Sequence, residues 1–133
     1  MILSRQQWKE LIFWARDSGN NECCGLLLGV APRVERATLA RNVAQEPRCS
    51  FEIDPELLIE AERNARLEGP PIVGYFHSHP NGAARPSSTD AAMAAVDGRT
   101  WLIIAKDDIT AWNPVYSDDG LVCFEKVRLV VEG

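Results

Sequence analysis

Apolar residues in the N-terminal segment recur at the spacing of a helix, and the later apolar runs are short enough to be strands. Ser4 and Gln7 match a capping box at the start of this first helix. One face of the helix is apolar, and we expect it to pack in the core. This face consists of Trp8, Leu11, Ile12 and Ala15.

Two further helices are predicted from their boundary residues. Asp54-Pro55-Glu56 is a strong helix start, because proline suits the first helical position and an acid suits the positive end of a helix. This helix is expected to reach about Glu68 and to stop at Gly69-Pro70-Pro71. A short alanine-rich helix follows Ser87, its predicted N-cap, and places Asp90 at the third helical position.

Strands fill most of the remaining chain. Apolar, β-branched and aromatic runs predict a hairpin, a short edge strand, a buried central strand and three strands near the C-terminus. The resulting order, α-β-β-α-β-α-β-β-β, predicts an α/β or α+β sandwich whose sheet has mixed strands. The predicted strands are residues 24–30, 33–44, 49–53, 71–76, 100–105, 110–116 and 121–131.

Length and charge restrict the class of protein. A chain of 133 residues suits one domain, residues 1–133, with a core of its own. A net charge of −5 gives no support for binding to nucleic acid or to an anionic membrane. The start, MILSRQQWKE, lacks the pattern of a signal peptide, and no apolar run approaches the ~20 residues that span a bilayer. We therefore expect a cytoplasmic protein.

The four cysteines are Cys23, Cys24, Cys49 and Cys123, and none belongs to a C-x-x-C pair. A structural zinc site built from all four is therefore not expected. In a reducing compartment such cysteines are mostly small buried apolar residues. A disulfide between strands is the alternative.

Candidate chemistry is concentrated in residues 74–90, GYFHSHPNGAARPSSTD, which contain both histidines of the chain. His77 and His79 end the predicted central strand, so their side chains share one face and lie roughly 6–7 Å apart along it. Pro80 ends the strand, a turn follows, and the next helix start presents Asp90. Two imidazoles and a carboxylate can bind one zinc ion and leave a position open for water.

Each part of this segment also has an ordinary structural explanation. A His-x-His pair on a strand is more often unrelated to metal. Ser87-x-x-Asp90 is close to a capping box, which by itself only starts a helix. The combination favours a metal site, because both histidines lie beside a turn that carries a carboxylate. Capping and metal binding are compatible, since a cap holds the carboxylate in place.

Glu22 stands directly before the strand-like run CCGLLLG. On local evidence it is a solvated loop carboxylate that follows a helix. A zinc hydrolase also needs a base that is not a ligand, one that takes a proton from water and returns it to the leaving amine. Spacing along the chain does not place Glu22 beside the histidines.

The combined motif resembles the JAMM signature of the MPN-plus metalloproteases. That pattern is a glutamate ahead of a CGLL-like strand, followed by H-x-H-P, six residues, a serine, two residues and an aspartate. Glu22, the segment from His77 to Pro80, Ser87 and Asp90 match it at each position. The resemblance extends over nearly the whole chain and implies a curved mixed sheet flanked by helices, similar to the cytidine deaminase architecture.

The resemblance also implies a zinc-dependent hydrolase. His77, His79 and Asp90 would bind one zinc ion per chain, and Glu22 would be the general acid/base. Ser87 would donate a hydrogen bond to the developing oxyanion. The compact chain has little room for the insertions with which eukaryotic deubiquitinases of the family grip linked ubiquitins. It looks more like the small prokaryotic members.

Those members imply a substrate. They are associated with ubiquitin-like sulfur carriers of the ThiS or MoaD type, so the resemblance implies a peptidase or isopeptidase that cleaves after a C-terminal Gly-Gly. We expect the extended tail to pair with a strand edge near the site. The alternatives are release of a cysteine joined to that tail, a non-catalytic MPN-type scaffold, and a hydrolase of cell-wall or phage-tail peptides. A zinc deaminase requires H-x-E and P-C-x-x-C, which the chain lacks.

Overall fold

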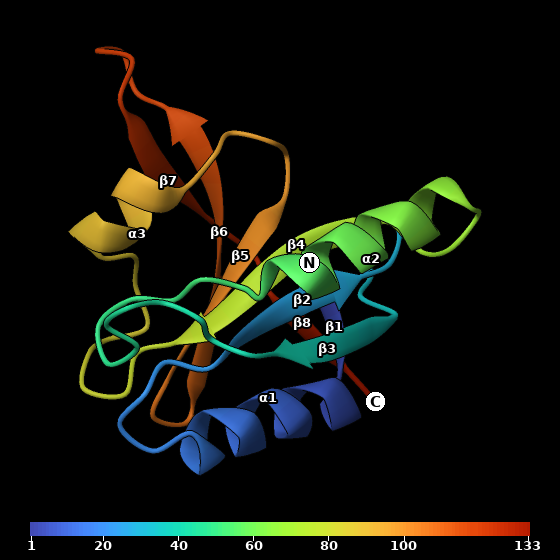
Figure 1. The fold of residues 1–133 in the computed structure, drawn as a ribbon, viewed down its shortest axis with the longest axis horizontal. Helices are drawn as coiled ribbons and strands as arrows, with labels where there is room; N and C mark the ends of the chain where they lie inside the picture. The colour runs from blue at the N-terminus through green and yellow to red at the C-terminus, as the bar shows by residue number, and fades with distance from the viewer.

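A computed structural model describes residues 1–133 as three helices and eight strands (Figure 1). The central sheet has six strands in the order β3-β2-β4-β5-β6-β7, and a second sheet pairs β1 with β8. None of the helices is long and apolar enough to cross a membrane. In chain order the elements are β1 (Ile2–Ser4), α1 (Arg5–Asp17), β2 (Cys24–Leu28), β3 (Arg36–Ala40), α2 (Pro55–Arg66), β4 (Ile72–Ser78), α3 (Ser88–Met93), β5 (Thr100–Ala105), β6 (Asp108–Tyr116), β7 (Val122–Val127) and β8 (Val130–Glu132).

The central sheet is mixed and has helices on both faces, which confirms the predicted α+β class. Its only parallel pair is β4 with β5, and the other neighbours are antiparallel. Successive residues of a strand point to opposite faces. Leu27 packs in the core beneath α1, whereas Leu26 and Leu28 pack beneath α2, so the two helices cover opposite faces (Figure 1).

The first two helices begin where the sequence predicts. The Ser4 hydroxyl accepts a hydrogen bond from the Gln7 N–H, and the Gln7 side chain accepts one from the Ser4 N–H, which completes the capping box. Asp54 caps α2, which begins with proline and ends at Arg66. Local capping chemistry is therefore enough to set these helix starts.

The core beneath α1 is the larger of the two. Leu11 and Ile12 are buried in it, and Trp14 stacks on Phe76 of β4 with ring centroids 5.7 Å apart. Gly25 of β2 lies next to the Phe76 ring, and a Cβ at this position would overlap that ring and a carbonyl oxygen of β3. Gly25, the first glycine of the CCGLLLG run, is therefore required for close packing.

Two predicted strands are wrong. Residues 49–53 form no strand, and only Ile53 makes an isolated bridge, to Asn42. The Ser50 carbonyl and the Glu52 N–H bond to the Asn42 side chain, a local alternative to part of a ladder. Residues 121–131 divide, because the chain leaves the sheet after Val127 and β8 pairs in parallel with β1. The three-residue strand β1 was not predicted, since its partner lies at the other end of the chain.

β4 is the strand that positions the candidate site. Its prediction as a buried strand leading into the first histidine is confirmed. His77 lies opposite Cys24 of β2 on one side and Ile103 of β5 on the other. The His79 N–H donates to the carbonyl oxygen of Ile104 at 2.8 Å, which holds the chain against β5 just beyond the end of β4.

Candidate active site

The two imidazoles and the carboxylate of Asp90 converge on one point. His77 Nε2 lies 3.0 Å from His79 Nε2 and 3.2 Å from Asp90 Oδ2, and the last two atoms are 3.1 Å apart. Atoms that bind one tetrahedral zinc ion at about 2.0–2.1 Å lie about 3.3 Å from one another. The three atoms therefore have the spacing and the chemistry of ligands of a single zinc ion.

His77 is held by aromatic packing. It is 0% exposed, and its Nδ1 has no hydrogen-bond partner. Phe51 stacks on the imidazole with centroids 4.3 Å apart, and Trp101 meets it edge-on at 5.5 Å. Metal-binding histidines usually donate their second N–H to an acceptor. Here two aromatic side chains fix the ring plane instead.

His79 is held by a hydrogen bond from its second nitrogen. His79 Nδ1 lies 2.9 Å from the carbonyl oxygen of Ala83, and a proton on Nδ1 leaves Nε2 as the lone pair that faces His77 and Asp90. The same loop is tied to β6, because the Thr110 hydroxyl donates to the carbonyl oxygen of Ala84 at 2.6 Å. The loop after β4 is therefore anchored on both sides.

Asp90 and Ser87 form the predicted capping box. The Asp90 N–H donates to Ser87 Oγ at 3.0 Å, and the Ser87 N–H donates to Asp90 Oδ2 at 2.9 Å. The carboxylate is thus oriented by the helix start while it faces the imidazoles. Ser87 Oγ only accepts in this box, so the hydroxyl proton is free to donate into the adjoining cleft.

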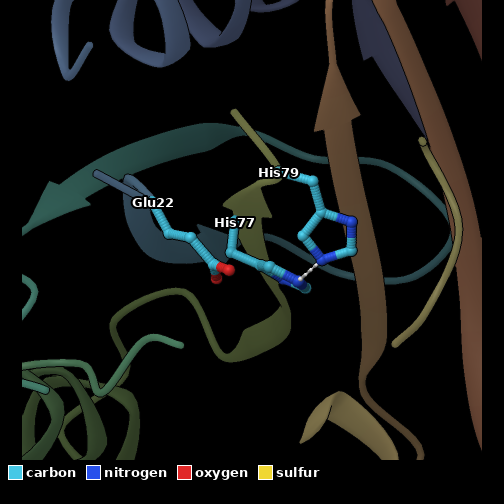
Figure 2. Close-up of side chains that lie close together, drawn as sticks. All are labelled: Glu22, His77 and His79. Atoms are coloured by element: carbon cyan, nitrogen blue, oxygen red, sulfur yellow. Dashed lines mark hydrogen bonds between the residues drawn. The ribbon is translucent and has the colours of Figure 1, made fainter. Parts of the chain in front are cut away.

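Glu22 lies beside the histidines because of strand register. Cys24 pairs with His77, and one step further the Ser78 N–H donates to the Cys23 carbonyl oxygen at 3.0 Å. Glu22 is the next residue and so lies next to His79. Figure 2 shows its carboxylate directed at the two imidazoles, and single ligand atoms of these three residues lie within 4.8 Å of one another. The structure therefore supplies the proximity that spacing along the chain did not.

The environment of Glu22 disfavours ionisation of its carboxyl group. The residue is 6% exposed, and its Oε1 has no hydrogen-bond partner. Burial raises the pKa of the carboxyl group to about 7, with the charge of His79 opposing and that of Asp90 adding to the rise. A carboxyl group with a pKa near neutrality suits proton transfer in both directions.

The directions of the pKa shifts agree with metal binding at His77 and Asp90 but not at His79. Burial lowers the pKa of His77. Burial opposes ionisation of Asp90 as well, but hydrogen bonds with His77 and His79 hold its pKa below the usual range. Burial would lower the pKa of His79, yet the hydrogen bond to Asp90 and other contacts raise it. Metal binding would have to displace that proton.

Asn42 is a site residue that sequence reasoning missed. It follows β3, and its side chain ties the segment that carries Glu22 to the loop before α2. The only signal in the sequence is an asparagine near the end of the predicted strand 33–44. Its amide makes four bonds to the backbone: Nδ2 donates to the carbonyls of Glu22 (2.9 Å) and Ser50 (3.1 Å), and Oδ1 accepts from the N–H groups of Ala44 (3.0 Å) and Glu52 (3.1 Å).

The cysteines take no part in the converging group. Cys23 and Cys24 are buried, as predicted, and burial raises the pKa of both, that of Cys24 to about 12. Cys49 and Cys123 are exposed, so the prediction of buried cysteines is wrong for these two. All four are free thiols.

Two cavities adjoin the site. One is a polar cleft of about 430 Å³ whose lining includes Glu22, His79 and Ser87. The other has about 310 Å³ and a mostly apolar lining that includes Phe51 and Trp101. The converging group therefore lies between a polar and an apolar space.

Comparisons with known proteins agree with this site. Residues 4–115 match the model of the prokaryotic homologs of the JAB domain. A desampylase of Haloferax volcanii is 39% identical over 88 residues, which are 65% of this chain and 63% of that protein, so the match spans less than two thirds of its length. A desampylase of Pyrococcus furiosus is 32% identical over 132 residues, covering 98% of this chain and 91% of that protein.

A solved structure shows the same fold. A JAB1/MPN domain protein of Archaeoglobus fulgidus aligns with a TM-score of 0.63 at 22% identity, over 100% of each chain. The class that the family match, the relatives and the site define is a hydrolase with a candidate metal centre. The chain belongs to the prokaryotic JAB-domain family and is similar to its small JAMM members.

Proposed function

We propose that the chain is a zinc-dependent isopeptidase and peptidase that cleaves conjugates of a ubiquitin-like protein after its C-terminal Gly-Gly. The observation that carries this proposal is the convergence of three ligand atoms within 3.0–3.2 Å of one another, with the buried Glu22 carboxylate beside them. The name desampylase, which both relatives carry, supports action on ubiquitin-like conjugates. The resemblance to small JAMM proteins suggests a carrier of the ThiS or MoaD type.

His77, His79 and Asp90 would hold the metal. Asp90 is the better third ligand, because one of its oxygens lies within 3.2 Å of both Nε2 atoms and is oriented by the Ser87 N–H. Zinc, when bound, lowers the pKa of a coordinated water and polarises a carbonyl group. Glu22 is left free to act as a base.

Glu22 would transfer the proton, and Ser87 would stabilise the developing oxyanion. Glu22 takes a proton from the attacking water and then gives it to the departing nitrogen. The Ser87 hydroxyl donates to the oxygen on which negative charge develops. A hydrogen bond of this kind typically lowers the barrier by about 3–4 kcal/mol. A Gly-Gly tail suits this cleft because it carries no side chains that would hold the backbone away from these groups.

The test is cleavage of a defined fusion by the purified chain. A MoaD-type carrier is extended beyond its Gly-Gly by a short peptide, and a second substrate links the same tail to a lysine side chain. We expect cleavage after Gly-Gly that a chelator abolishes and zinc restores. We also expect Glu22→Gln to keep about one zinc per chain while losing turnover by about 10²-fold or more.

Two controls make the result specific. Replacing the last glycine of the tail by valine should block cleavage if the cleft accepts only an unbranched backbone. Zinc binding without cleavage of either substrate would contradict the proposal and favour a scaffold or another substrate. Turnover by Glu22→Gln equal to that of the unaltered chain would remove Glu22 from the mechanism.

A further inference from the structure

The polar cleft contains two arginines that the proposed mechanism does not use. Arg48 and Arg85 both line the cleft and both are exposed. Neither guanidinium forms an ion pair, whereas those of Arg16, Arg33 and Arg99 do. Both are therefore free to bind an anionic group that enters the cleft.

The two arginines belong to different loops that meet at the site. Arg48 directly follows Pro47, whose carbonyl oxygen accepts a 2.7 Å hydrogen bond from the N–H of Glu22. Arg85 lies on the loop that leads from His79 to α3, the loop anchored by its carbonyl groups to His79 and β6. One arginine is thus tied to the segment of the base and the other to the segment of a metal-binding histidine.

The charge of the cleft differs from that of the chain. Glu22 is the only acidic side chain that lines the cleft, so the lining beyond it is positive in a chain with a net charge of −5. Such a local field attracts anions toward the cleft. Two guanidiniums provide paired N–H groups that match the geometry of a carboxylate.

We propose that Arg48 and Arg85 form a carboxylate-binding subsite on the leaving-group side of the scissile bond. The inference rests on the proposed function, in which Glu22 returns a proton to the leaving nitrogen. The leaving group therefore lies on the Glu22 side of the cleft, where Arg48 lies. The carboxylate is either the free α-carboxylate of a residue joined through its amine to the Gly-Gly tail, or an acidic side chain near that bond.

The cleavage step is a simple hydrolysis. The bond between the glycine carbonyl carbon and the nitrogen breaks, the hydroxyl of water adds to the carbon, and its proton goes to the nitrogen through Glu22. The products are a tail that ends in a glycine carboxylate and a free amine that carries the recognised carboxylate. No oxidant or further reactant is needed.

The test uses three peptides with one tail that ends in Gly-Gly. Beyond it they carry alanine with a free carboxylate, alanine amide, or aspartate amide. We expect the zinc-loaded chain to favour the free carboxylate over alanine amide by about tenfold in kcat/KM, mainly through KM, since exposed ion pairs each contribute a few-fold. Equal cleavage of aspartate amide would identify an acidic side chain as a second source of the carboxylate.

Variants locate the preference. Arg48→Ala and Arg85→Ala should each reduce it, and Arg48→Lys should retain part of it, because lysine keeps the charge without the paired geometry. Arg63→Ala is the matched control. Arg63 is exposed on α2 and does not line the cleft, so this variant changes the net charge equally and should leave the preference unchanged.

Equal kcat/KM for the free carboxylate and the amide in the unaltered chain would overturn the subsite. An unchanged ratio in both alanine variants would do the same. If none of the peptides is cleaved, the proposed function fails, and binding of the same peptides measured by calorimetry then decides about the subsite. A binding preference for the free carboxylate that Arg48→Ala removes supports it, and equal binding of carboxylate and amide overturns it.

Discussion

His77 and Glu22 face the same point but are held there by different means. His77 lies at the end of a buried strand, and its ring is fixed by Phe51 and Trp101 without a hydrogen bond at Nδ1. Glu22 lies in a loop, and the backbone around it is fixed by hydrogen bonds to Pro47 and Asn42. The strand side is built by packing and the loop side by hydrogen bonding.

The difference separates two tasks. A metal ligand must hold its position to within a small fraction of an ångström, and close packing around a buried ring does this without further polar groups. A base that carries a proton from one atom to another needs an oxygen without a fixed partner, such as Oε1 of Glu22. Hydrogen bonds to the backbone hold the segment and leave that carboxylate free.

The largest expected effect comes from removing a ligand on the strand side. On the proposed ligand set, His77→Ala removes one of three protein ligands, so zinc content measured by mass spectrometry should fall to near zero. The value of kcat/KM should drop by at least about 10³-fold, because metal activation contributes several kcal/mol. A variant that keeps one zinc per folded chain, with the fold checked by circular dichroism, would contradict the ligand assignment.

Ser87 tests a second group that is held by hydrogen bonds, the cap of α3. Ser87→Ala and Ser87→Gly both lose the hydroxyl, and each should lower kcat by about 10²–10³-fold with zinc retained. Their stabilities should differ, because alanine at an N-cap costs about 1 kcal/mol and glycine only a few tenths. Urea unfolding and steady-state kinetics measure the two effects. Recovery of turnover in Ser87→Gly would show that the cap, and not the hydroxyl proton, matters.

Asn42 should have a smaller effect, which acts through the loop that carries Glu22. Asn42→Ala frees the segment of Glu22, so we expect kcat to fall by between about 10- and 10²-fold, with zinc affinity unchanged. Asn42→Asp keeps the oxygen that accepts from the Ala44 and Glu52 N–H groups but loses the donor to Glu22, and it should impair kcat in the same way. A fall in zinc affinity at normal kcat would mean that Asn42 supports the metal centre instead.

Phe51 should have the smallest effect, and it acts on the packing around His77. Phe51→Leu removes the ring that stacks on His77, so zinc affinity measured by chelator competition should weaken by about two- to tenfold, since such aromatic contacts contribute ~0.5–1.5 kcal/mol. Once saturated with zinc, the variant should turn over normally. Phe51→Tyr keeps the ring and is the control. A loss of kcat at unchanged affinity would show that packing does not position the ligand.

Local chemistry made part of this protein predictable. The capping boxes at Ser4 and Ser87 and the proline start of α2 depend on residues within one turn, and the structure has all three. The placement of His77 and His79 at the end of a buried strand depends only on the alternation of side chains and on the proline that follows. Such features could be predicted because no distant residue is needed to form them.

Long-range pairing decided the rest. Residues 49–53 were predicted as a strand, but Asn42 binds their backbone as a loop. β1 and β8 form because the two ends of the chain meet, and the local sequence of neither end predicts the pairing. Periodicity describes what a segment can become, whereas the partner that satisfies its backbone groups is chosen among all segments of the chain.

The sequence by itself determined the candidate donor set, one histidine on a strand, a second just beyond its end and an aspartate in a helix cap, since these positions follow from spacing of a few residues. Only the tertiary structure brought Glu22 to them, through the register of β2 against β4, and only it placed Arg48 in the same cleft. The physical reason is distance along the chain. Glu22 and His79 are 57 residues apart in the sequence, and they become neighbours only when β2 pairs with β4.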